Sequence, residues 1–220
     1  VIVSKDDATI VRTSQINFGV LATKAIGAVK IQNVINRASV SVNKSGSNIA
    51  GFVGVADGNL DISFIDCVNA ADIIGGRTAG FLANVNKGEC NFYFYNCVND
   101  GDISCGATVE TNPASGFLAR TTDGDTKSIK FEYCANFGNI DSKYATGAFF
   151  GCGLGDVTVN ACYNEGDITV SVANATTRPV GGFVGGSNAQ DKAAYDVTVT
   201  NSIQNGDVIV IENHPDSSSA

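Results

Sequence analysis

Four aspartates recur just after a small-residue turn, and carboxylates at such a spacing could bind calcium: Asp72, Asp102, Asp167 and Asp207. If successive turns stack at β-strand spacing, neighbouring carboxylates lie about 5 Å apart and repel each other unless water or a cation separates them. Asn139 takes the same place in the middle of the set and relieves that repulsion. Alternatively, each aspartate faces water and accepts a backbone N–H of its own turn. We favour this second interpretation and expect no cofactor, with calcium as the alternative.

Seven cysteines are the second set of reactive side chains. Four occupy one repeated position, Cys67, Cys97, Cys134 and Cys162, whereas Cys90, Cys105 and Cys152 lie elsewhere. Disulfides between stacked coils are compatible with the ~4.4 to 6.8 Å that a disulfide requires between Cα atoms. We favour reduced thiols that act as small buried apolar groups. The sequence has no Cys-x-x-Cys pair and its one histidine, His214, lies in a polar tail, so neither a zinc site nor histidine-based nucleophilic catalysis is expected.

A carbohydrate-active enzyme is the catalytic alternative, because polysaccharide lyases and hydrolases also use parallel β-helices. Such an enzyme needs paired carboxylates at a defined separation, or a calcium cluster with an Arg or Lys base. The arginines occupy different places in their repeat units: Arg12, Arg37, Arg77, Arg120 and Arg178. Acidic residues that depart from the repeat form no evident constellation. We therefore expect no catalysis.

Composition narrows the classes of partner. The 220 residues are 44% apolar and 16% charged, enough to bury a core, and the net charge is −8. Phosphate contacts need clustered Lys and Arg, and the 14 present are scattered, so nucleic acid is not an expected partner. No apolar run is long enough to span a bilayer, and no signal segment is evident. Because Met is absent even at position 1, we expect a segment of a longer protein.

The elements that must position these residues belong to an internal repeat. A quartet of small, apolar, apolar and small residues begins at Gly19, Gly51, Gly80, Gly116, Ala148 and Gly182. Each quartet is followed by a strand-like segment that ends in a polar turn, namely residues 29–40, 62–73, 92–103, 129–140, 157–168 and 197–208. The period of 28 to 40 residues indicates a solenoid whose units bury apolar surface only against their neighbours.

Within one unit, alternation such as Val157-Thr-Val159 predicts a half-buried strand. The quartet predicts a second strand and the segment after the Asp position a third. We therefore predict an all-β, right-handed parallel β-helix of about six coils, each of three short strands. Helical repeats would need a 3.6-residue apolar period, and propeller blades would need a fourth strand.

Two columns are predicted to stack inside this helix. An amide ladder contains Asn36, Asn69, Asn99, Asn136, Asn164 and Gln204. A ring stack contains Phe52, Phe81, Phe117, Phe149 and Phe183, with Val20 at its start. Hydrogen bonds along the axis would satisfy the buried amides. A positive φ is expected at the turn glycines Gly101, Gly138, Gly166 and Gly206.

One repeat domain is predicted over residues 1–211, followed by a polar tail at 212–220. Function is expected in the loops that interrupt the repeat, around Thr111, Asp123 and Asn188. Two sequons, at Asn43 and Asn174, would carry glycans only in a eukaryotic protein.

The quartets Gly182-Phe-Val-Gly185 and Gly51-Phe-Val-Gly54, together with Asn160-Ala-Cys-Tyr-Asn-Glu-Gly-Asp167, resemble the GLUG-type repeats of bacterial surface proteins. The resemblance extends from about Gly19 to Val210, with Phe in place of the usual Leu and Ala22, Ala83 and Ala119 in place of the closing Gly. It implies an extracellular scaffold or attachment module.

We therefore expect a non-catalytic extracellular scaffold or adhesive segment of a cell-surface protein. The expected partners are a protein or glycan of a host or neighbouring cell and flanking repeats of the same polypeptide. A carbohydrate-active β-helix domain and a calcium-stabilised binding module are the alternatives.

Overall fold

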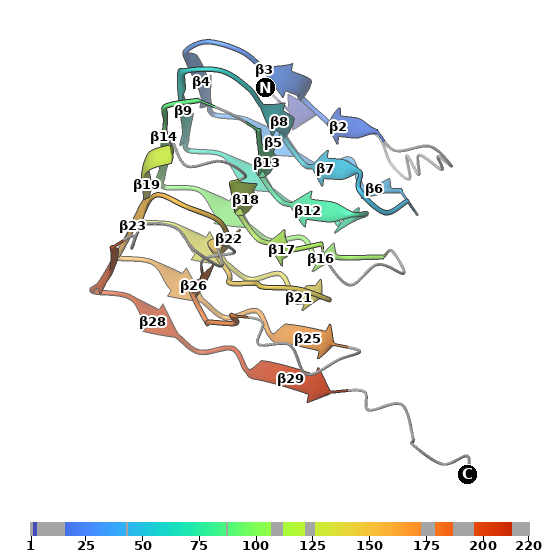
Figure 1. The fold of residues 1–220 in the computed structure, drawn as a ribbon. Helices are drawn as coiled ribbons and strands as arrows, with labels where there is room; N and C mark the ends of the chain where they lie inside the picture. Colours follow the sequence, from blue (N-terminus) through green and yellow to red (C-terminus); the bar gives the residue numbers. More distant parts are fainter. Residues whose placement is uncertain are drawn as a thin grey trace.

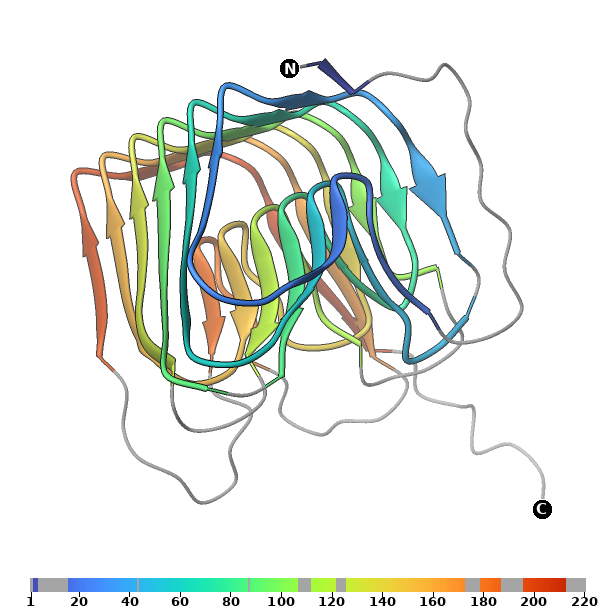
Figure 2. The same cartoon turned by 90° about the horizontal axis from the view of Figure 1, so that it is seen from above.

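The computed structural model describes residues 2–3, 16–42, 44–86, 88–106, 112–121, 126–172, 179–186 and 196–212. These residues form an all-β parallel solenoid of stacked coils, and the equivalent strands of successive coils form five parallel sheets (Figure 1). Seen from the amino-terminal end, the chain runs clockwise as it recedes, so the solenoid is right-handed (Figure 2). The predicted fold class is confirmed, with about five turns between the first coil and the last.

We number the sheets in the order in which the chain visits them within one coil. Sheet I contains β2 (Asn17–Gly19), β7 (Asn48–Ala50), β12 (Arg77–Ala79) and β17 (Ala114–Ser115). Sheet II contains β3 (Ala22–Ala25), β8 (Val53–Ala56), β13 (Leu82–Val85), β18 (Leu118–Thr121), β22 (Phe150–Cys152) and β26 (Val184–Gly186). Sheet III contains β4 (Val29–Gln32), β9 (Leu60–Ile65), β14 (Cys90–Tyr95), β19 (Thr126–Glu132), β23 (Asp156–Asn160) and β27 (Val197–Thr200).

The chain then enters the two remaining sheets. Sheet IV contains β1 (Ile2–Val3), β5 (Ile35–Asn36), β10 (Val68–Asn69), β15 (Val98–Asn99), β20 (Ala135–Asn136), β24 (Tyr163–Asn164) and β28 (Ile203–Gln204). Sheet V contains β6 (Val40–Ser41), β11 (Ile73–Ile74), β16 (Ile103–Ser104), β21 (Ile140–Ser142), β25 (Ile168–Val172) and β29 (Val208–Glu212). We number the coils from one to six by their strand in sheet III, from β4 to β27.

The prediction of three strands per coil is wrong, because a full coil has five. Each predicted strand-and-turn segment is divided by a corner. Residues 62–73, for example, contain the last part of β9, all of β10 and the first residue of β11. The quartet is likewise not a strand. It spans the bend between sheets I and II, as Gly51 and Phe52 do between β7 and β8.

This bend folds sheets I and II into the interior of the coil, as Figure 2 shows. The first glycine of the quartet lies at the tip, against the amide ladder. A Cβ on Gly51 would lie 2.4 Å from Asn69 Oδ1 and 2.4 Å from the carbonyl oxygen of Gly80. Close approach therefore requires a small residue at this place in the quartet.

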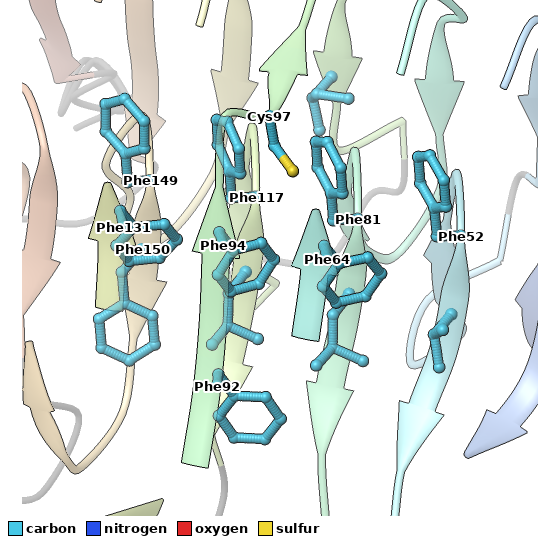
Figure 3. Packing of buried hydrophobic residues seen from close by; sticks show 14 of the residues in the cluster. Phe52, Phe64, Phe81, Phe92, Phe94, Cys97, Phe117, Phe131, Phe149 and Phe150 are labelled. Carbon is cyan, nitrogen blue, oxygen red and sulfur yellow. The ribbon is translucent and has the colours of Figure 1, made fainter. Parts of the chain in front are cut away.

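The predicted ring stack is confirmed, and a second stack lies beside it (Figure 3). Phe52 and Phe81 are parallel with ring centroids 4.8 Å apart, and Phe81 and Phe117 repeat that spacing. A second column, formed by Phe64, Phe94 and Phe131 of sheet III, meets the first edge to face. Such pairs add about 0.5 to 1.5 kcal/mol each beyond the apolar area they bury.

The amide ladder is also confirmed. Each asparagine donates from Nδ2 to the side-chain oxygen of the next ladder member, at 2.8 Å from Asn69 to Asn99 and 2.8 Å from Asn99 to Asn136. The same Nδ2 atom donates to the backbone carbonyl two residues later, as Asn99 does to Gly101 at 2.9 Å. Both N–H groups and the oxygen of the Asn99 amide are therefore hydrogen-bonded although the side chain is fully buried, which explains why an amide recurs at this position.

Positive φ angles occur at a different column from the predicted one. The turn glycines, such as Gly101, have no positive φ; a Cβ there would lie 2.1 Å from the carbonyl oxygen of Ala71, so these glycines permit close stacking of coils. The left-handed conformation occurs instead at the corner between sheets III and IV. The corner residues, with φ from 49° to 55°, are Asn33, Asp66, Asn96, Tyr133, Ala161 and Asn201.

Candidate functional site

The aspartates predicted as a column lie together on the exposed turn between sheets IV and V. Three of the carboxylates accept the backbone N–H of the equivalent residue in the next coil: Asp102 N donates to Asp72 Oδ1 at 3.0 Å, Asn139 N to Asp102 Oδ1 at 2.8 Å and Asp207 N to Asp167 Oδ1 at 2.9 Å. Asn139 Oδ1 does the same for Asp167 at 3.0 Å. The expectation of a cap within the same turn is thus wrong, because the stacked turn supplies the donor.

Among the described residues, no group of three or more His, Cys, Asp or Glu side chains could hold a metal ion. The sequons at Asn43 and Asn174 lie outside the described residues, as do the loop residues Thr111, Asp123 and Asn188. Within the described ranges, no helix is long and apolar enough to cross a bilayer.

All seven cysteines are buried and free. The thiols of the repeated position donate to the backbone carbonyl two residues earlier, as Cys67 does to Ile65 at 3.1 Å. Burial raises the pKa of Cys105 to about 11 and that of Cys152 to about 12. Because the thiolate is the reactive form, Cys105 and Cys152 are structural rather than nucleophilic.

The structure brings together two arginines that the sequence appeared to scatter. Arg77 of β12 donates to Asn48 Oδ1 at 3.2 Å, and the Nε atoms of Arg77 and Arg120 are buried without a hydrogen-bond partner. Burial, and then the nearby Arg120, lower the pKa of Arg77. Among the described residues, neither arginine forms an ion pair with a carboxylate.

Five aromatic side chains on the outer surface of sheets III and IV form the most distinctive exposed feature. They come from coils three to five, and we call them the aromatic face: Tyr93, Tyr95, Tyr133, Phe137 and Tyr163. They lie on the side opposite to the buried rings, because inward and outward residues alternate along a strand. Tyr133 is 57% exposed and Phe137 is 43% exposed.

Three tyrosines form the first part of this face. Tyr93 and Tyr95 both point outward from β14, with ring centroids 5.9 Å apart. Tyr133, at the corner of the next coil, meets Tyr95 edge to face at 5.5 Å. Tyr93 donates from its hydroxyl to Glu132 Oε2 at 2.6 Å, and burial together with this carboxylate raises the pKa of Tyr93.

The second part lies on sheet IV. Phe137 and Tyr163 have ring centroids 5.9 Å apart. Tyr163 donates to Glu165 Oε2 at 3.1 Å, and this bond raises the pKa of Tyr163. Ala135 connects the two parts, since it is two residues from both Tyr133 and Phe137 and pairs with Tyr163 in the next coil.

Tyr133 departs from the repeat at a conformational cost. Its φ of 55° suits Asn, Asp or Gly, and four of the six corner residues are Asn or Asp. A bulky side chain in this region is disfavoured by about 1 to 2 kcal/mol. Strain of this kind is concentrated at functional sites, so Tyr133 marks the aromatic face as the candidate site.

Sequence reasoning did not find this face, because it concentrated on residues that fit the repeat and on the long loops. The available signal was a bulky residue, Tyr133, aligned with Asn and Asp in other units. Comparisons with models of protein families, with curated proteins and with solved structures gave no match.

Proposed function

We propose that this chain is a non-catalytic repeat module that serves as scaffold and adhesive segment of an extracellular cell-surface protein. The aromatic face is the observation that carries the proposal. Tyrosine is enriched in binding surfaces because it combines a large apolar ring with a polar hydroxyl. The rings project from packed sheets, so little conformational entropy is lost on binding.

The non-catalytic part of the proposal is supported by the roles that the polar columns already have. The carboxylates of the Asp column accept backbone N–H groups, and the ladder amides bind one another. The extracellular part is supported by the resemblance of the quartets to GLUG-type repeats. Calcium is not required by this arrangement.

We also propose that flanking coils of the same polypeptide cover the end of the solenoid. Strand pairing in the sixth coil continues the register of the fifth, since Val197 pairs with Val157 and Val208 with Ile168. The inward positions that are buried in the fifth coil are exposed in the sixth. These are Val197, Val199, Val208 and Val210, exposed by 42 to 53%. A further coil would bury them and pair the open strand edges.

An adhesion assay tests the proposed function. Beads coated with the protein would be exposed to purified fibronectin, gelatin, mucin and neutral polysaccharides. The matched variant carries Tyr95→Thr, Tyr133→Asn and Phe137→Asn, which are the residues of the sixth coil at these positions. Retention of at least one probe by the protein, lost in the variant, supports the proposal. Equal behaviour of the two proteins toward every probe overturns it.

A further inference from the structure

We infer that the aromatic face binds a neutral polysaccharide, with the sugar chain lying along the solenoid axis across coils three to five. The inference rests on the proposed adhesive function and assigns a chemical class to its partner. The rings come from three successive coils, and coils separated by about 4.8 Å place the outer rings about 10 Å apart along the axis. This length suits two or more linked sugar residues rather than a single small molecule.

The rings provide the apolar part of sugar recognition. One side of a pyranose ring presents C–H groups with partial positive charge, and the face of an aromatic ring is negative. Tyr133 and Phe137 are the most exposed rings and flank the small side chain of Ala135. A sugar over Ala135 could therefore contact a ring on either side.

The groups around the rings provide the polar part. In the described part of the chain, the hydroxyls of Tyr95 and Tyr133 have no hydrogen-bond partner, so both can donate to and accept from sugar hydroxyls. Glu132 and Glu165 supply acceptors, and Lys130, which pairs with Tyr93 across the strands, supplies a donor. Donors and acceptors beside flat rings match the hydroxyl-rich edge of a sugar.

Charge favours a neutral chain over an acidic one. Two carboxylates, Glu132 and Glu165, contact tyrosines of the face, whereas the one cation paired with a ring residue among the described strands is Lys130. The whole chain carries a net charge of −8. Sulfated or uronic-acid polymers and nucleic acids would be repelled.

Affinity electrophoresis measures the interaction directly. The protein would migrate through gels that contain hydroxyethylcellulose, xylan or dextran, with chondroitin sulfate as the acidic comparison, and chitin beads would test an insoluble chain. We expect retardation by at least one neutral polymer and none by chondroitin sulfate. Tyr133→Asn should weaken that retardation by about tenfold or more, and Tyr95→Thr should weaken it as well.

The choice of test variant and one control variant separate binding from folding. Tyr133→Asn relieves backbone strain, so weaker binding by this variant does not reflect unfolding. Ile74→Ser removes an exposed apolar side chain from sheet V and should bind as the parent does, because Ser41 and Ser104 already flank it.

The outcomes distinguish this inference from the proposed function. Retention of fibronectin or gelatin alone would overturn the glycan assignment and leave the adhesive function. Retention of mucin alone, whose glycans are largely acidic, would overturn the choice of a neutral chain and leave the adhesive function. Binding of a neutral polymer that survives Tyr133→Asn and Tyr95→Thr would overturn the site. Stronger retardation by chondroitin sulfate than by any neutral polymer would overturn the choice of ligand class. No retention of any probe would overturn both proposals.

Discussion

Replacing Asn99 by Ala should destabilise the solenoid more than replacing any end member of the amide ladder. Asn99 accepts from Asn69 Nδ2 at 2.8 Å and donates to Asn136 Oδ1 at 2.8 Å and to the Gly101 carbonyl at 2.9 Å. The variant leaves one N–H and two oxygen acceptors unsatisfied in a fully buried place. Each orphaned group costs about 1 to 3 kcal/mol, so the three together give an expected loss of about 3 to 9 kcal/mol.

Gln204→Ala is the matched control at the carboxyl-terminal end of the ladder. Gln204 accepts from Asn164 at 3.1 Å and donates to the Gly206 carbonyl at 2.8 Å, in a partly exposed place. Water can replace both bonds, so the expected loss is about 1 kcal/mol. Urea unfolding followed by circular dichroism gives both values, with the m-value checked for a change in cooperativity.

The Asn99→Asp variant tests the direction of the ladder bonds. A carboxylate at this position cannot donate, and it would face the acceptor Oδ1 of Asn136 and the carbonyl of Gly101. Burial and these acceptors would raise the pKa of the introduced carboxyl group in the folded protein above its unfolded value. The variant should therefore be least stable at neutral pH and regain stability as the pH falls through that folded pKa. Two results would refute this account of the ladder: a loss from Asn99→Ala no larger than that from Gln204→Ala, or stabilisation of Asn99→Asp by rising pH.

Four further outcomes are expected. Tyr133→Asn and Ala161→Asn should each raise the unfolding free energy by about 0.5 to 1 kcal/mol, because Asn tolerates a positive φ; a lower value for both in urea unfolding contradicts the strain. The cysteines, Cys97 among them, should resist a thiol reagent such as DTNB until urea unfolds the protein, and rapid labelling of folded protein would show that burial does not protect them. Asp102→Asn should leave the thermal midpoint unchanged, with calcium or with chelator, because Asn139 already accepts the same kind of bond; a calcium-dependent shift in the parent argues for a site. Phe94→Leu should cost about 1 to 2 kcal/mol by loss of ring contacts, and an unchanged urea midpoint would discount the stack.

The inward half of the molecule could be predicted from sequence because stacking makes it periodic. Identical side chains recur where each satisfies or packs against its counterpart in the next coil, so Asn99 and Phe81 could be assigned correctly from spacing alone. The number of strands could not be predicted in the same way. Corners at residues such as Asp66 divide the backbone into separate strands, but the apolar pattern of the sequence continues across them. Only the positive φ shows where the corners are.

The turn glycines show a second limit of sequence reasoning. Glycine permits both a positive φ and the close approach of another chain segment, and the residue alone does not distinguish them. At Gly101 close approach is the cause, since Ala71 of the preceding coil occupies the space of a Cβ. The corner column has positive φ but uses Asn or Asp at four of its six positions, where the short side chain tolerates this conformation.

Outward-facing residues are not constrained by stacking inside the coil, so a departure from the repeat has a different meaning there. An outward residue such as Phe137 can change without disturbing the ladder or the rings, so its departure from the polar or small residues of other coils costs the fold little. Tyr133 is different, because its backbone conformation makes a large side chain unfavourable and Asn would serve the fold better. Backbone strain is concentrated at functional sites, so a bulky, exposed side chain at a strained position supports a role in binding. Tyr133 is therefore stronger support for a binding surface than the four other rings, and its substitution by Asn should show the two effects in opposite directions: greater stability and weaker binding.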